Sequence, residues 1–160
     1  MLHRYNTSQH HPTSCHLTCT PVKGSNQPFK LNPYNKRINL SRDGGYTDIL
    51  IAIDEKVPEN LDILEKLQVY LKEASQILYR ATKNKLYIER VTIMIPSRWM
   101  DQQHWLQPAE NETFERAGIL IAQKNLAYGD TPYTLQPRGC GEEADYIHLT
   151  PDFLTTSQTI

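Results

Sequence analysis

Cys140 and His148 lie close together in the C-terminal part of the sequence and could form a nucleophile and its base. A cysteine nucleophile needs a neighbouring group that activates it, and histidine is the usual choice. Glu142 and Glu143 follow Cys140, however, and their negative charge disfavours the thiolate that such a nucleophile requires. We therefore favour structural roles: Cys140 as a structural thiol or half of a disulfide, and His148 as a hydrogen-bonded histidine in a strand.

Metal coordination is the second chemistry that the residue types suggest. Asp54 ends an apolar run, as in metal-dependent adhesion sites, but the next residues supply no hydroxyl ligands, so a capping or surface acid is favoured. The N-terminal region offers further ligand types without a second well-spaced pair, and we favour a flexible tail over a zinc site there. These tail residues are His10, His11, Cys15, His16 and Cys19.

Complete catalytic motifs are missing from the sequence. It contains no His-Glu-x-x-His, no Gly-x-Ser-x-Gly, no glycine-rich dinucleotide turn and no phosphate-binding loop. We assign no catalytic residue, no metal ligand and no cofactor-binding residue. The chain as written is therefore not expected to act as an enzyme by itself.

Length, charge and composition limit the kinds of partner and the cellular compartment that the sequence predicts. The 160 residues suggest one domain, and a net charge of −1 without a basic patch does not predict nucleic-acid binding. No apolar run approaches the roughly 20 residues that a transmembrane helix needs, and no signal peptide is visible. Asn39 and Asn111 are candidate N-glycosylation sites, as is Asn6, and the odd count of three cysteines suggests an external partner for one of them.

The elements that would position these residues begin near Ile38. Residues 1–37 resemble a tail with little fixed structure, and residues 155–160 a short C-terminal tail. Asp43-Gly44-Gly45 indicates a turn. Strands are expected at 48–54, 86–95 and 117–122, and a short one at 145–149.

One long helix is expected between the first two strands. No Gly or Pro interrupts residues 59–83, and apolar side chains recur at spacings of three and four. The apolar face is expected to contain Leu61, Leu64, Leu67, Leu71, Ala74, Leu78 and Ala81. Trp99 and Trp105 are interpreted as packing residues. The order predicts an α/β fold, with a mostly parallel sheet of three to five strands and one long covering helix.

From Ile38 onward the chain resembles the N-terminal domain of the calcium-activated chloride channel regulator family. The resemblance rests on ordered strings at residues 45–54, 57–59, 73–75, 81–83, 91–96 and 132–134, together with Trp99. The most specific are Cys140-Gly141-Glu142 and the run from Tyr146 to Leu154. Together they place residues 38–154 in one domain.

The resemblance implies an extracellular or cell-surface protein that modulates a calcium-activated chloride conductance without forming the pore. It also implies a partial zincin-like layer, because the family's N-terminal domain is similar to self-cleaving zinc metalloproteases. In the family a His-Glu-x-x-His follows shortly after the segment that corresponds to 146–154, whereas here residues 155–160 read TTSQTI. Zinc is therefore expected in full-length members, but no residue of this chain is expected to bind it.

Three hypotheses follow. The first is a non-catalytic fragment of this family that acts through contacts with a chloride channel or another surface protein. The second is an incomplete sequence of a self-cleaving zinc metalloprotease of the same family. The third is an unrelated α/β binding module.

Overall fold

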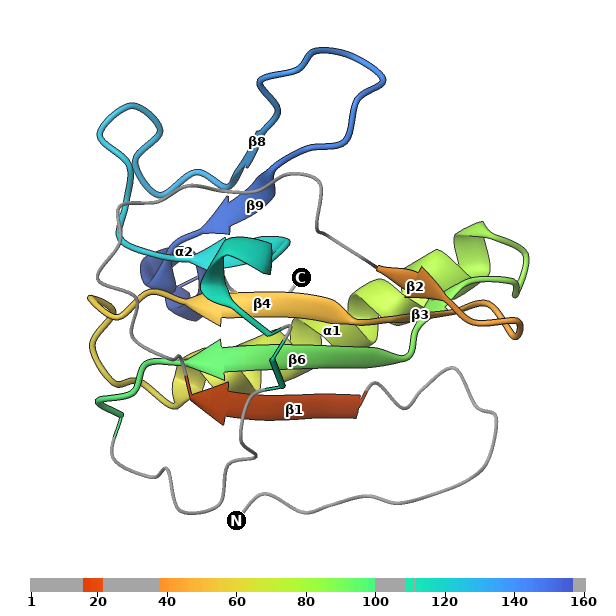
Figure 1. Ribbon diagram of the computed structural model, residues 1–160, viewed down its shortest axis with the longest axis horizontal. Coiled ribbons are helices and arrows are strands. Elements are labelled where there is room, and N and C mark those ends of the chain that lie inside the picture. Colours follow the sequence, from red (N-terminus) through yellow and green to blue (C-terminus); the bar gives the residue numbers. More distant parts are fainter. Residues whose placement is uncertain (1–15, 22–37, 100–108, 111, 157–160) are drawn as a thin grey trace.

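The computed structural model describes residues 16–21, 38–99, 109–110 and 112–156 (Figure 1). Along these residues the chain forms strands, two α-helices and a 3-10 helix. In order they are β1 (His16–Pro21), β2 (Asn39–Leu40), β3 (Gly45–Thr47), β4 (Ile49–Ile53), α1 (Asp62–Ala81), β5 (Tyr87–Ile88), β6 (Arg90–Ile95), η3 (Phe114–Arg116), β7 (Ile119–Ile121), β8 (Tyr133–Leu135), β9 (Tyr146–Leu149) and α2 (Pro151–Thr156).

A six-stranded sheet with the order β1-β6-β4-β7-β9-β8 forms the centre of the described part of the chain. The neighbours from β1 to β9 pair in parallel, whereas β8 pairs with β9 antiparallel. Parallel strands that are covered on both faces read as continuous apolar runs. This explains β4, in which Leu50, Ile51, Ala52 and Ile53 are all buried.

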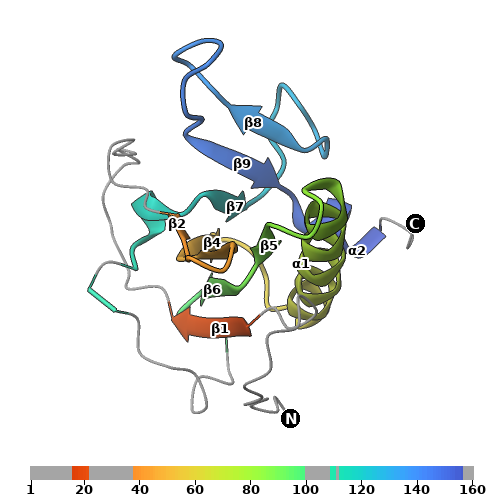
Figure 2. The same cartoon turned by 90° about the vertical axis from the view of Figure 1, so that its right-hand side faces the viewer.

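Helix α1 covers one face of this sheet (Figure 2). Ile63, Leu67, Leu71 and Ser75 are its buried residues, and the spacing of four places them on one side of the helix. They pack on strand residues such as Ile51 and Ile93 in the larger apolar cluster. The strands β4 and β6, which α1 connects, pair in parallel, as predicted from the strand–helix–strand order.

The predicted apolar face of the helix needs correction. Leu61, Ala74 and Ala81 are exposed, and Leu64 and Leu78 are only half-buried. The buried positions missed from sequence are Ile63 and Ser75. Ser75 is buried because its hydroxyl accepts a hydrogen bond from the Ile88 backbone N–H at 2.9 Å, so a polar side chain is satisfied inside the core.

The opposite face of the sheet carries a second, smaller apolar cluster. It consists of Leu50, Ala52, Met94, Ala117 and Leu120, with Phe114 and Tyr146 packed against it. Side chains alternate across a strand, so β4 contributes to both clusters. The sheet is therefore the middle layer of the core.

A second sheet has the order β2-β3-β5 and includes one antiparallel and one parallel pairing. The predicted turn joins β2 to β3, and there Gly44 has a φ of 87° and its N–H donates to the Ser41 carbonyl at 3.1 Å. Glycine is favoured at such a φ because it has no Cβ. The turn brings Gly44 onto the segment before β5, where its carbonyl accepts from Tyr87 N–H.

Several sheet predictions differ from the structure. Among the described residues the chain forms two sheets and not one, and the larger has six strands and not three to five, whereas the α/β class is confirmed. The run at 86–95 divides into β5 and β6, which lie in different sheets. Residues 16–21 of the expected tail form β1, because an extended Thr-containing segment can pair with the free edge of β6. The rest of residues 1–37 lies outside the described ranges.

Candidate functional site

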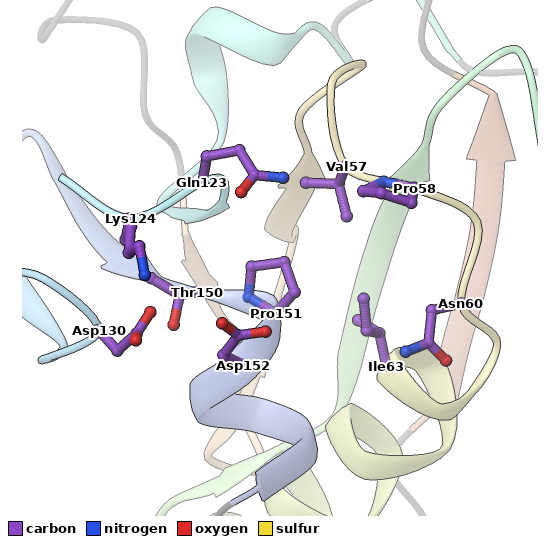
Figure 3. Close-up of a pocket in the computed structure, with 10 residues that line it drawn as sticks. All are labelled: Val57, Pro58, Asn60, Ile63, Gln123, Lys124, Asp130, Thr150, Pro151 and Asp152. Atoms are coloured by element: carbon purple, nitrogen blue, oxygen red, sulfur yellow. The ribbon is translucent and has the colours of Figure 1, made fainter.

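The carboxyl ends of β4, β7 and β9 surround a cavity of about 300 Å³ (Figure 3). Its lining residues follow these three strands in the sequence and continue into the starts of the two helices. They are Val57, Pro58, Asn60, Ile63, Gln123, Lys124, Asp130, Thr150, Pro151 and Asp152. A cavity of this size is at the lower end of the range for small-molecule sites, about 300–1,000 Å³.

The cavity has an apolar floor and a charged rim. Val57 and Ile63 are fully buried, and Thr150 is buried with its hydroxyl accepting from Phe153 N–H at 3.1 Å. Lys124, Asp130 and Asp152 are exposed. In Figure 3 the three charged side chains lie around Thr150, whereas Val57, Pro58 and Ile63 lie on the opposite side.

Local structure holds the floor in place. Asp54 follows β4, and its carboxylate accepts from Lys56 N–H at 2.8 Å, which is the capping role favoured from sequence. The Val57 carbonyl accepts from the Trp99 indole N–H at 3.2 Å and from the Arg98 guanidinium at 2.7 Å. Trp99 is fully buried, so the packing role predicted for it is confirmed, whereas Trp105 lies outside the described residues.

An aromatic cluster joins β8 and β9 on the face of the sheet that carries the smaller apolar cluster. His148 on β9 is buried and stacks on Tyr133 of β8, with ring centroids 4.7 Å apart and an interplanar angle of 17°. The ring of Tyr133 also lies against those of Tyr128 and Tyr146, with ring centroids 4.5 Å and 6.5 Å apart. Burial lowers the pKa of His148, against a smaller opposite effect of a backbone hydrogen bond with Gln123, while Nδ1 has no partner among the described residues.

Tyr146 is a second perturbed group in this cluster. Burial, and then its charge interaction and hydrogen bond with Tyr133, raise the pKa of Tyr146 to about 12. Both groups are thus neutral near pH 7. The cluster is a neutral packing unit that fastens edge strand β8 to β9.

Acidification is expected to weaken this unit. The pKa of His148 is lower in the folded protein than its unfolded value of about 6.5, so the unfolded state binds more protons and stability falls as the pH falls through that value. Urea unfolding at pH 7.5 and pH 5.5 measures this loss. His148→Phe keeps an aromatic ring in the stack and should reduce the difference between the two pH values. An unchanged difference in the variant would assign the pH dependence to other groups.

The Cys140–His148 pair is not assembled as a catalytic site. Cys140 is an exposed, free thiol in the loop between β8 and β9, whereas the His148 ring is buried against Tyr133. In the same loop Arg138 forms an ion pair with Asp145 at 2.8 Å. The structural or disulfide role of Cys140 stays a prediction.

The metal-ligand candidates of the N-terminal region lie only partly within the described residues. His16 and Cys19 are part of β1, whereas His10, His11 and Cys15 lie outside the described residues. In the described ranges no group of three or more His, Cys, Asp or Glu side chains is arranged to hold a metal ion. Neither α1 nor α2 combines the length and apolarity that a bilayer crossing requires.

The fold and the cavity together define an α/β domain that has a central mixed sheet and a small, polar-rimmed site at the carboxyl ends of its strands. A family model described as "Calcium-activated chloride channel N terminal" matches residues 38–160. The chain belongs to this family, which confirms the resemblance seen in the sequence. The third hypothesis, an unrelated binding module, is excluded.

Curated relatives agree with this assignment. Calcium-activated chloride channel regulator 1 of Bos taurus is 40% identical over 75% of this chain, and regulator 2 of Mus musculus is 38% identical over 73%. Regulator 2 of Homo sapiens is 40% identical over 71%. These matches span 12–13% of the relatives' own length. No solved structure matches the chain.

Proposed function

We propose that this domain serves a calcium-activated chloride channel regulator by contacting another protein at the cell surface, and that it modulates chloride conductance without catalysing a reaction. Family membership supports the link to such regulators. The observation that carries the contact role is a group of exposed apolar side chains on β8 and the loop before it. We name this group the hairpin patch: Leu126, Tyr128 and Leu135.

The hairpin patch has the properties of a contact region. Leu126 is fully exposed and Tyr128 is 56% exposed, although both are large apolar residues. Exposed apolar groups of this kind mark contact surfaces more often than single scattered residues do. Figure 1 shows β8 and the loops beside it projecting away from α1. Tyr128 also stacks on Tyr133, so part of the patch is held in a fixed orientation before any partner arrives.

Chloride current tests the proposal. The full chain, supplied to the outside of cells that carry a calcium-activated chloride conductance, should change the current, and Leu126→Ser with Tyr128→Ser should remove most of the change. Val69→Ser with Ile77→Ser on the exposed side of α1 is the matched control, because it also replaces two exposed apolar side chains. A hairpin variant as active as the wild type, or a control variant as inactive as the hairpin variant, contradicts the proposed contact.

A second candidate is that the domain belongs to a self-cleaving zinc metalloprotease with a zincin-like layer. The position of α2 favours it. This helix follows β9 and packs against α1, with the Tyr70 hydroxyl 3.5 Å from the Leu154 carbonyl. In the family, a metal-binding motif is expected shortly after the segment that corresponds to Leu154. An in-frame His-Glu-x-x-His in the transcript, with self-cleavage of the longer product that a chelator stops, would support this candidate. A transcript without the motif would exclude it.

An extracellular location and glycosylation are part of the first proposal. Asn39 is exposed on β2, where its side-chain amide donates a hydrogen bond to Asp48. Asn111 lies outside the described residues. Produced in a secretory pathway, the chain should therefore carry an amidase-sensitive glycan at Asn39. Asn39→Gln should remove that glycan in a gel-shift comparison, and Ser41→Ala should do the same; a shift that persists in both would place the glycan elsewhere.

A further inference from the structure

The strand order creates a switch point between β4 and β7. After β4 the chain passes through α1 to β6 on one side, and after β7 it continues to β8 and β9 on the other. The connections from these two neighbouring strands therefore diverge. In open α/β sheets a crevice forms at such a point outside the carboxyl ends of the strands, and ligands bind there.

The cavity lies at this switch point. Val57, Pro58 and Asn60 follow β4, and Gln123 and Lys124 follow β7. The ends of the strands are joined by continuing hydrogen bonds, in which Asp54 N–H donates to Ile121 O at 2.9 Å and Ala122 N–H to Leu149 O at 3.1 Å. These bonds tie the base of the cavity to the end of the sheet, while most of its lining residues lie in the segments that follow the strands.

The charged rim defines what kind of group would bind. Within the described part of the chain, no ion pair or hydrogen bond involves the side-chain charges of Lys124, Asp130 or Asp152. Two carboxylates against one ammonium group leave one net negative charge. Figure 3 shows the charged side chains on the side of the cavity away from Val57 and Ile63.

We propose that this cavity binds an alkylammonium group, with the ammonium between Asp130 and Asp152 and the aliphatic arm on the floor formed by Val57 and Ile63. The arm gains from leaving water, since burial of a CH₂ group contributes about 0.8 kcal/mol. The net negative rim selects the cationic head over a carboxylate. A free aliphatic amine and the side chain of a lysine on a peptide present the same chemistry.

Ligand titrations of the full 160-residue chain, followed by amide NMR shifts, test the proposal. Butylammonium should shift the amides of residues 57–63, 123–130 and 150–152, whereas butanol and butanoate at the same concentrations should bind more weakly. Added salt should weaken butylammonium binding, because exposed charges are screened. Equal binding of butanol, or shifts elsewhere in the chain, would overturn the proposal. A comparison of butylammonium with Nα-acetyl-lysine amide, whose side-chain ammonium is free, then shows whether a free amine or a peptide lysine is the better ligand.

Charge variants make the test specific. Asp130→Asn and Asp152→Asn should each weaken butylammonium binding about two- to fivefold, the range expected for exposed ion pairs. Lys124→Met should strengthen it, since a repelling charge is removed; the same change would weaken a site for anions or zwitterions. Glu73→Gln on the exposed side of α1 is the control and should change nothing. Weaker binding in Lys124→Met, or no effect of either Asp variant, would contradict the proposed site.

Discussion

Gly44→Ala is expected to destabilise the protein by about 2–5 kcal/mol. A Cβ at this position would lie 1.8 Å from the Lys85 backbone oxygen, which cannot move without shifting the start of β5. The φ of 87° adds a left-handed penalty of about 1–2 kcal/mol for a residue with a Cβ, and overpacking costs about 1–3 kcal/mol. Chemical unfolding measures the loss as a change in the free energy of unfolding.

Two other glycines separate the causes. Gly129 has a φ of 58° with nothing within 4 Å of the added Cβ, so Gly129→Ala should show the backbone penalty alone. Gly118 has open space and no positive φ, so Gly118→Ala should be nearly neutral. If Gly44→Ala is no more damaging than Gly129→Ala, the close approach of the turn to Lys85 is not the cause.

Trp99→Ala is expected to cost about 3–5 kcal/mol, the usual range for removing a large aromatic side chain from a core. Trp99 is 1% exposed and belongs to the cluster that includes Ile53, Val57 and Ile95. Because its indole N–H donates to the Val57 carbonyl, the loss should also loosen the floor of the cavity. Thermal and urea unfolding give the stability, and amide exchange at residues 57–63 reports the floor.

Trp99→Phe is the matched variant. It keeps an aromatic ring but removes the donor, while Arg98 still donates to the Val57 carbonyl. The expected loss is about 1–2 kcal/mol, from one hydrogen bond and some packing. Equal losses in the Ala and Phe variants would mean that the hydrogen bond, not the burial of the ring, carries the effect.

The strands that the sequence predicts well are those with uninterrupted apolar runs. Residues 49–53 and 119–121 are short and rich in isoleucine, which favours buried strands over helices, and β4 and β7 are found there. β1 was missed because its residues, HLTCTP, are half polar and end in proline, as edge strands often do. β8 is a three-residue edge strand, and its pairing is set by β9 and not by its own sequence.

The candidate site was predictable only in its parts. Asp54 and Trp99 have the capping and packing roles that their neighbours in the sequence indicate. The cavity depends on β7 lying beside β4 on the side away from β6, and strand order is a property of the whole sheet that local patterns do not encode. For the same reason the stack of His148 on Tyr133 was missed, because antiparallel pairing brings the two residues together.

The pairing of β1 with β6 has a consequence for biosynthesis. His16 pairs with Arg90 and Pro21 with Ile95, so this ladder joins distant parts of the chain. β6 is buried from Val91 to Ile95 and apolar except at Thr92, and an open edge on such a strand is a template for aggregation. β1 precedes β6 in the sequence and therefore leaves the ribosome first. In a nascent chain β1 is therefore already available to pair with the edge of β6 when β6 is synthesised, which blocks pairing of that edge with another chain.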